Sequence, residues 1–395
     1  MRRLAPLVVM AACLLQSPVA HAETKSQEWT WCEGGKDITP DLQISGCTSI
    51  ILGGRETTNN LSIAFNNRGN GYVQRKDDDK ALSDFNQSTR INPKNSLAHR
   101  NRANLHRRAK RYDNALSDYN EAIRIKPDYA RAYDDRGDLY LEQKEFDLAI
   151  ASYEQAVKYE PGNATFWADR GVGRIRKWGA KYRTIEDEME DAAGRNPALR
   201  DDFVRAYDDL SQAIKLKPDS DWALRNRCFL NVLRKQIDAA IQDCSEAIRV
   251  DPTAAYAWHW RGYSYLQQKK YGPAISDADE AIRLGPTEAE RWNFRGNVYF
   301  GRSNDVADAK KALENYSQAI TLRPTALFYK NRGAVQKYLK DFPAAVKDYT
   351  EAFRLDPKYY DALLGRSQAY AGMGESAKAE EDAVAAAQLR EKLGL

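Results

Sequence analysis

An Arg returns at a nearly constant interval along this chain of 395 residues, in most cases directly before a small residue and between aromatic residues. The octets FNNRGNGY at 65–72 and WHWRGYSY at 258–265 show the pattern. The intervals are 34, 34, 34, 57, 34, 34, 37 and 34 residues, for Arg68, Arg102, Arg136, Arg170, Arg227, Arg261, Arg295, Arg332 and Arg366. Self-similarity at a fixed period of this length predicts a stack of repeated units, because no single unit buries its apolar face alone.

Two further series keep the same interval. A Pro that cannot continue a helix ends each of the first eight periods, at Pro93, Pro127, Pro161, Pro218, Pro252, Pro286, Pro324 and Pro357. An Ala follows most of the Arg by thirteen residues, at Ala81, Ala115, Ala149, Ala240, Ala274, Ala345 and Ala379. Ala206 and Ala312 complete this series after insertions of 23 and 4 residues. We therefore expect about nine units over residues 60–395, with an insertion near 178–200 and an early start of the second helix in the seventh unit.

These residues resemble the tetratricopeptide repeat. Aromatic, small, Tyr, Ala, aromatic, Ala and Pro residues follow at family spacing, as in FNNRGNGYVQRKDDDKALSDFNQSTRINP. The resemblance runs from about residue 60 to the C-terminus, and it implies an all-α fold, a right-handed solenoid of about nine helix-turn-helix repeats. It also implies a concave groove, lined by the first helices, that binds a partner.

Packing and ion pairing within each unit explain the small residue and the Arg, respectively. The small residues predict two helices in close approach, at Gly69, Ala103, Gly137, Gly171, Cys228, Gly262, Gly296, Gly333 and Ser367. Sixteen residues after most of the Arg stands an Asp, which predicts a ladder of ion pairs within the units. Its pairs include Arg68–Asp84, Arg102–Asp118, Arg261–Asp277 and Arg332–Asp348, whereas Ser152 and Asn315 replace the Asp in two units. The alternative is a basic stripe for phosphate, which the accompanying acids disfavour.

The first 22 residues read as a signal peptide. Arg2 and Arg3 form a basic region, residues 4–15 an apolar run of twelve, and Ala20-His21-Ala22 a cleavage site. Twelve residues at about 1.5 Å each are too short to cross a hydrocarbon core of about 30 Å. We expect cleavage after Ala22 and a periplasmic or secreted protein of the exported bacterial type. The rival interpretation is a lipoprotein anchored through Cys13.

Export would place the remaining cysteines in an oxidising compartment. We expect two disulfides, Cys32–Cys47 and Cys228–Cys244, with small buried thiols as the alternative for the second pair. Residues 23–59 are expected to form an N-terminal lid that the first disulfide links. Within it, Thr39 as N-cap, Pro40 in the first turn and Gly53-Gly54 as terminator outline a short helix that places Ile44, Ile50, Ile51 and Leu52 on the first repeat.

Residues with catalytic or metal-binding side chains are sparse. Only His99, His106 and His259 would remain after processing, without neighbours at metal-ligand spacing, and the sequence contains no nucleotide-binding or hydrolase motif. We therefore expect no enzyme, no catalytic residue, no metal and no cofactor. The formal net charge of +4 falls to +2 without residues 1–22, which disfavours nucleic acid as partner. No stable membrane span is expected, and the sequence does not indicate an oligomeric state.

The resemblance implies groove positions five, two and one residues before each Arg and two residues after it. Asn70, Asn101 and Arg131 make only part of a clamp for a peptide carboxylate, since Asn66 and Asp135 stand where bases are needed. Units five to seven instead carry aromatic residues at these positions, which predict a partner-binding groove. The predicted groove residues are Trp222, Phe229, Tyr256, His259, Trp260, Tyr263 and Phe294. The alternative is that successive units bury these rings against each other.

Three hypotheses about function follow. The first is a non-catalytic envelope scaffold whose groove binds a protein segment. The second is a glycan-binding scaffold for polysaccharide assembly or export, because Trp and Tyr faces also stack on sugar rings. The third is an enzyme, for which the sequence offers no residues. Peptide- and glycan-binding assays separate the first two.

Overall fold

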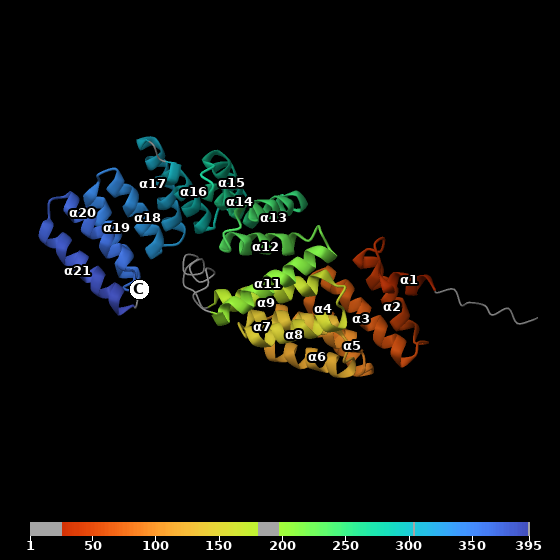
Figure 1. The fold of residues 1–395 in the computed structure, drawn as a ribbon. Coiled ribbons are helices and arrows are strands. Elements are labelled where there is room, and N and C mark those ends of the chain that lie inside the picture. The colour runs from red at the N-terminus through yellow and green to blue at the C-terminus, as the bar shows by residue number, and fades with distance from the viewer. Residues whose placement is uncertain (1–25, 181–196, 303–304, 394–395) are drawn as a thin grey trace, which may run out of the picture. The chain divides into compact units, whose positions relative to one another are not determined.

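The chain is built from paired α-helices (Figure 1). The computed structural model describes residues 26–180, 197–302 and 305–393, and within these ranges it contains twenty helices and no β-strand. The signal peptide expected over residues 1–22 and most of the insertion near 178–200 lie outside the described residues. The chain divides into two compact units, residues 1–132 and 133–395.

The first unit holds three helical hairpins. They are α1 (Gln27–Glu33) with α2 (Pro40–Gly53), α3 (Thr58–Gln74) with α4 (Asp78–Ile91), and α5 (Ser96–Arg108) with α6 (Tyr112–Ile125). Helix α7 (Ala130–Glu142) begins in the first unit and continues into the second.

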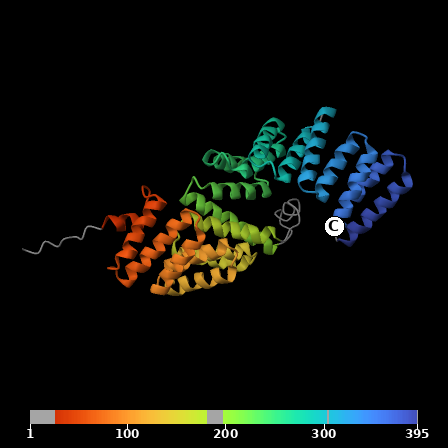
Figure 2. The ribbon, with the colours of Figure 1, turned by 180° about the vertical axis from the view of Figure 1, so that it is seen from behind.

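The second unit also consists of helices paired along the chain, and Figure 2 shows them from behind. Its helices are α8 (Phe146–Tyr159), α9 (Ala164–Gly179), α11 (Pro197–Leu216), α12 (Asp221–Leu233), α13 (Ile237–Val250), α14 (Ala255–Gln267), α15 (Tyr271–Leu284), α16 (Ala289–Arg302), α17 (Val306–Leu322), α18 (Ala326–Tyr338), α19 (Phe342–Leu355), α20 (Tyr360–Gly372) and α21 (Ser376–Lys392). Helix α17 has 17 residues where α13 and α15 have 14, as the four extra residues of the seventh unit predict.

Local sequence accounts for where the helices begin. Asn95, Asn163, Ser220 and Thr325 each cap a first helix by accepting a backbone N–H bond, because the first N–H groups of a helix lack internal partners. Thr253 precedes α14 but does not cap it: the N-cap of α14 is Ala254, and the Thr253 hydroxyl donates to Asp251.

The two helices of a hairpin approach closely at the small residue after the Arg. A Cβ atom added to Gly137 would lie 2.6 Å from the ring of Tyr153, and one added to Gly296 would lie 2.7 Å from the ring of Tyr316. Both rings are buried, and the Ala series of the second helices is almost wholly inaccessible. In these hairpins, as in that of Gly69 and Phe85, an aromatic ring on the second helix packs into the space left by a glycine on the first.

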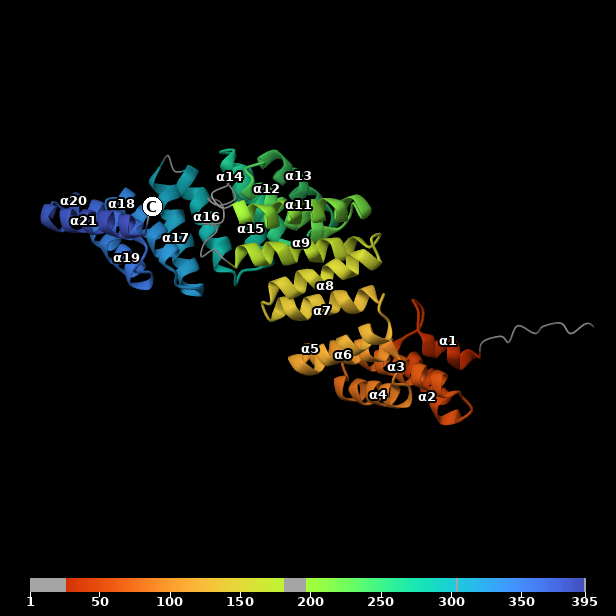
Figure 3. The same cartoon turned by 60° about the horizontal axis from the view of Figure 1, so that its bottom comes forward.

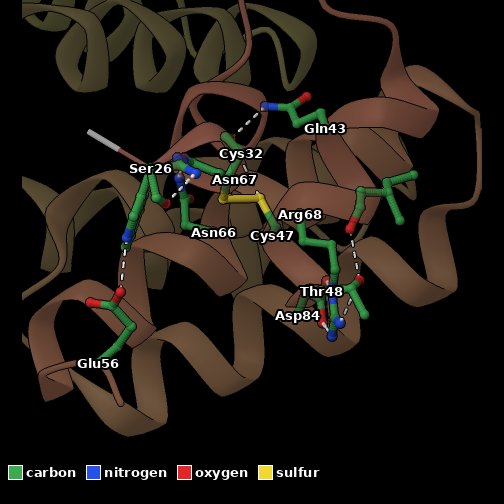
Figure 4. Close-up of a disulfide and its surroundings, with 12 residues drawn as sticks. Ser26, Cys32, Gln43, Cys47, Thr48, Glu56, Asn66, Asn67, Arg68 and Asp84 are labelled. Atoms are coloured by element: carbon green, nitrogen blue, oxygen red, sulfur yellow. Dashed lines mark hydrogen bonds and ion pairs between the residues drawn. A yellow bond between two sulfur atoms is a disulfide. The ribbon is translucent and has the colours of Figure 1, made fainter. Parts of the chain in front are cut away.

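The N-terminal lid consists of two helices, of which the sequence indicated only α2. Thr39 caps α2 and Gly54 ends it in the left-handed conformation, as expected, whereas α1 was missed. The Cys32–Cys47 disulfide joins the two helices, and the Gln43 side chain donates to the Cys32 carbonyl (Figure 4). Helix α2 packs on α3. The expectation that Leu52 also packs there is wrong, because Leu52 is 79% exposed.

The second disulfide, Cys228–Cys244, joins the two helices of one hairpin. Cys228 takes the place of the glycine on α12, and Cys244 takes the place of the aromatic ring on α13. The Cα atoms are 5.4 Å apart and both side chains are fully buried, which is ordinary disulfide geometry. The bond therefore replaces the ring-on-glycine contact that other hairpins use.

Each repeated Arg lies between the two helices of its hairpin. Through Nε and Nη2 the guanidinium donates to both oxygens of one Asp, at N–O distances of 2.6 to 3.1 Å, in Arg68–Asp84, Arg102–Asp118, Arg170–Asp209, Arg227–Asp243, Arg261–Asp277, Arg332–Asp348 and Arg366–Asp382. In the two units without the Asp, Arg136 donates to Ser152 and Arg295 to Asn315. These bidentate, charge-assisted bonds bind the hairpin internally.

The remaining Nη1 group of the same Arg reaches the helix that precedes the hairpin. Its acceptors are Thr48 for Arg68, Asn86 and Thr89 for Arg102, Ser211 for Arg227, Ser245 for Arg261, Asp279 for Arg295, Ser317 for Arg332 and Thr350 for Arg366. Figure 4 shows Arg68 between Thr48 of α2 and Asp84 of α4. One Arg side chain thus joins three helices. For the first repeat, α2 supplies the hydrogen-bond acceptor that the preceding repeat supplies in later repeats.

Candidate partner-binding face

The seven aromatic and imidazole side chains of the predicted groove come from three successive first helices of the second unit. Trp222 and Phe229 lie on α12, Tyr256, His259, Trp260 and Tyr263 lie on α14, and Phe294 lies on α16. Helix α14 contacts both of the other two helices, so the structure brings the seven residues together. We call this set the aromatic face.

Six of the seven rings form one continuous cluster. The ring centroids of Phe229 and Trp260 are 4.9 Å apart, and those of Tyr256 and Trp260 are 5.7 Å apart. On the other side of the cluster, the His259 centroid lies 4.9 Å from that of Phe294 and the Tyr263 centroid 5.7 Å from that of Trp260. Most of these pairs are tilted or edge-on, which is the arrangement that aromatic quadrupoles favour.

Burial divides the aromatic face into a packed part and an exposed part. Phe229, Trp260 and Phe294 are 7%, 3% and 3% exposed, so these three rings are core residues and not an open groove surface. Trp222 and Tyr256 are each 36% exposed, and His259 and Tyr263 are half-buried. The surface offered to a partner is therefore narrower than the sequence pattern suggested.

The reason for this burial is a contact between neighbouring repeats. The residue directly before the Arg in one unit meets the residues two before and two after the Arg of the preceding unit. In the first repeats Asn101 occupies this position and donates to both Asn66 and Asn70, and near the C-terminus Asn331 donates in the same way to Asn293 and Asn297. Trp260 and Phe294 lie directly before the Arg of their own units. Their rings pack on rings of the preceding unit, Trp260 on Phe229 and Phe294 on His259. The Asn66, Asn70 and Asn101 amides thus engage one another.

Trp222 lies beside charged groups that the sequence reasoning did not select. Its Nε1 donates to Asp169 Oδ1 at 3.0 Å, and the Arg225 guanidinium lies 4.6 Å from its ring centroid. Burial, aided by the nearby Asp138 carboxylate, raises the pKa of Asp169 to about 7, although the Trp222 bond opposes the rise. Asp169 directly precedes Arg170, so the same positional rule that selected Trp260 could have found it.

Two nitrogens of the aromatic face are enclosed without a hydrogen bond in the described residues, His259 Nδ1 and Trp260 Nε1. Burial, together with the charge of Arg291, lowers the pKa of His259 to about 4. His259 is therefore neutral at pH 7, and its ring packs as an uncharged aromatic against Phe294.

Neither a metal centre nor a membrane segment emerges in the described parts of the chain. No cluster of three or more His, Cys, Asp or Glu side chains in these parts is arranged to hold a metal ion. Among the same residues, no helix combines the length and the apolar character that a membrane crossing requires.

Comparison with known proteins gives matches to one family. Residues 95–159, and residues 234–289 and 330–392, match models of the tetratricopeptide repeat. The human mitochondrial import receptor subunit TOM70 is 33% identical over 82 residues, which are 19% of this chain and 14% of the receptor. The small glutamine-rich tetratricopeptide repeat-containing protein 2 of Saccharomyces cerevisiae is 41% identical over 54 residues, 13% of this chain and 16% of that protein. These matches cover less than a sixth of either relative.

Comparison with solved structures matches a tetratricopeptide repeat protein from Parabacteroides merdae, with a TM-score of 0.47 and 16% identity over 71% of this chain and 97% of that one. PilF of Pseudomonas aeruginosa has a TM-score of 0.46 and 17% identity over 59% and 94% of the two chains. YrrB, described as a TPR protein with an unusual peptide-binding site, has a TM-score of 0.39 and 19% identity over 51% and 92%. The 34-residue period, the helical hairpins and the matched models together identify this chain as one that contains tetratricopeptide repeats, matched over residues 95–159, 234–289 and 330–392.

Proposed function

We propose that this chain is a non-catalytic scaffold that binds a protein segment on the aromatic face, with Trp222 and Tyr256 as its exposed contact residues. Tetratricopeptide repeats form protein-binding scaffolds, which sets the class of partner. The observation that carries the proposal is the exposure of these two large rings beside a buried ring cluster. Trp and Tyr dominate binding hot spots, and a packed base beneath them limits the entropy lost on binding.

Charged groups beside the rings support a protein segment as ligand. Arg225 covers one face of Trp222, and the Asp221 carboxylate lies 3.5 Å from Arg225. A sugar ring would have to displace the guanidinium to stack on that face, whereas a peptide can bond both to the Arg and to the acid. We therefore favour a protein segment as the ligand, and the binding test described below distinguishes it from the glycan alternative.

We further propose that the protein acts in the periplasm or outside the cell, after removal of residues 1–22. Both disulfides join fully buried cysteines, and such bonds persist in oxidising compartments. Sequencing the N-terminus of the mature protein from an envelope fraction tests this directly. A mature chain that begins at Glu23 supports the proposal, and one that begins at a lipidated Cys13 replaces it.

The binding proposal is tested with the mature chain immobilised as bait for envelope proteins, followed by peptide and glycan arrays. Replacing Trp222 and Tyr256 together by Ala should abolish retention of the captured protein, while circular dichroism shows that the variant keeps its helical fold. The control is Trp292→Ala, which removes a partly exposed Trp outside the aromatic face whose Nε1 donates to the Pro286 carbonyl. Retention that survives the double substitution, or that the control reduces equally, would overturn the proposal.

A further inference from the structure

Six lysines occupy the same place in six repeats and share an unusual backbone conformation. They lie eight residues after the repeated Arg, in the turn between the two helices of a hairpin, at Lys76, Lys110, Lys144, Lys235, Lys269 and Lys340. Their φ angles lie between 57° and 63°, in the left-handed region. In the ninth unit the same position holds Gly374, with φ 78°.

Folding alone does not favour lysine at this position. A residue with a side chain is strained in the left-handed conformation, whereas glycine adopts it freely. A cation at the C-terminus of a helix regains part of this cost through the helix dipole. Folding alone therefore does not select lysine over glycine at this position.

These lysines also differ from the other surface cations in their partners. Arg124, Arg249, Arg283 and Arg354 each pair with a Glu three residues earlier on the same helix. By contrast, all six left-handed lysines are exposed, and no acid of the described residues lies within ion-pair distance of them. Their charges are thus available to another molecule.

Two neighbouring turns concentrate this charge. Arg234 and Lys235 lie between α12 and α13, and Lys269 and Lys270 lie between α14 and α15. Helix α14 packs against both α12 and α13 (Figures 1 and 3). Gln268, next to Lys269, donates to Asp238 in the first turn of α13, so the two turns are adjacent. We call these four residues the basic edge.

Little negative charge balances the basic edge within the described residues. Helix α15 has Lys270 as its N-cap and no acid in its first turn, and Gln236 is the N-cap of α13. The first turn of α13 holds one acid, Asp238, which accepts from the Gln268 side chain, so a single carboxylate there stands against the four cations. At three of the other four positions an acid directly follows the left-handed lysine: Asp77 follows Lys76, Glu145 follows Lys144 and Asp341 follows Lys340, whereas Arg111 follows Lys110.

We propose that the basic edge is a second contact surface, which binds an acidic segment of a protein partner. It lies at the turns of the hairpins, whereas the aromatic face lies along the first helices, so the proposal does not depend on the function of that face. Charge complementarity defines the ligand as a run of Asp and Glu side chains. Four cations in two turns of a nearly neutral chain suit a short acidic peptide better than a nucleic acid or an anionic membrane, which require an extended positive surface.

The probe is a fluorescein-labelled peptide of alternating Glu and Ser, and its binding to the full chain is measured by anisotropy at low ionic strength. Replacing Lys235 and Lys269 together by Gly should weaken binding about tenfold. The same substitutions should leave the thermal midpoint unchanged or raise it, because Gly adopts the left-handed conformation freely. Binding should also weaken steeply as salt is added.

The matched control replaces Lys144 and Lys340 by Gly, which makes the same chemical change beside an acid. It should leave binding unchanged within about twofold. Equal weakening by both double variants, or wild-type binding by the Lys235/Lys269 variant, would overturn the proposal. So would tighter binding of a single-stranded oligonucleotide of equal charge, or of phosphatidylglycerol vesicles, than of the peptide.

Discussion

Arg261 donates to both carboxylate oxygens of Asp277, at 2.8 Å each, and its third nitrogen donates to Ser245 on the preceding helix. The Asp277 side chain is 4% exposed and that of Arg261 is 17% exposed. The same fork occurs in most repeats, so one type of side chain links helices both within a repeat and between repeats. This arrangement makes the ladder a determinant of how the units stack.

The ladder predicts a strong coupling between its two charges. Arg261→Leu alone should destabilise the protein by about 3 kcal/mol, because it strands a buried carboxylate. Arg261→Leu together with Asp277→Leu should cost much less than the sum of the single changes. Denaturant unfolding of the four proteins measures the coupling, and additive changes would show that the two side chains do not interact.

The close approach at the small residues predicts that two glycines respond differently to replacement by Ala. Gly296→Ala should destabilise by about 1–2 kcal/mol, because the new methyl group meets the buried Tyr316 ring, which a bond from its hydroxyl to Asn297 holds in place. At Gly333 the nearest ring atoms are 3.3 Å away, and the helix propensity of Ala, about 1 kcal/mol better than that of Gly, should offset the contact. Thermal unfolding of the two variants compares them, and equal midpoints would contradict the packing argument.

The second disulfide should contribute to stability. Cys228 and Cys244 are 16 residues apart, and closing such a loop restricts the unfolded chain by about 3 kcal/mol. Replacing both by Ala should lower the unfolding free energy by about this amount, since both positions accept small residues. Peptide mapping of the exported protein without reductant checks the bond itself, and free thiols at both positions would contradict it.

Two partly buried groups on or beside the aromatic face predict opposing effects of pH on stability. The pKa of Asp169 is raised from 3.8 to about 7, so the folded state binds its proton more tightly and stability falls as the pH rises between these values. The pKa of His259 is lowered from 6.5 to about 4, so stability falls as the pH drops through that range. The two effects oppose each other between pH 4 and 6.5, and only the Asp169 effect continues above that.

Single variants separate these effects. Asp169→Asn should remove the loss of stability between pH 6.5 and 7, and His259→Gln should remove the loss on acidification. Urea unfolding at several pH values gives the measurement, with the wild type as reference. A wild-type profile that is flat from pH 4 to 7, together with flat profiles of both variants, would show that neither group is perturbed.

The sequence by itself determined the features that depend on residues close together in the chain. The 34-residue period, the caps at Asn95 and Ser220, the early start of α17 and the Arg–Asp spacing of sixteen all arise within one hairpin. Helix periodicity places an Arg and an Asp opposite each other across a short turn without reference to the rest of the protein. The same local reasoning placed Cys228 opposite Cys244.

Only the tertiary structure decided what happens between hairpins. Trp260 and Phe294 occupy positions that the repeat pattern assigns to an open groove, yet they are buried, because each meets the side chains of the preceding repeat. The bond from Arg261 to Ser245 and the bond from Trp222 to Asp169 likewise join different repeats. Such contacts depend on how one helical pair is rotated and translated onto the next. That arrangement follows from the packing of many side chains at once, and a repeating pattern within one chain segment does not contain it.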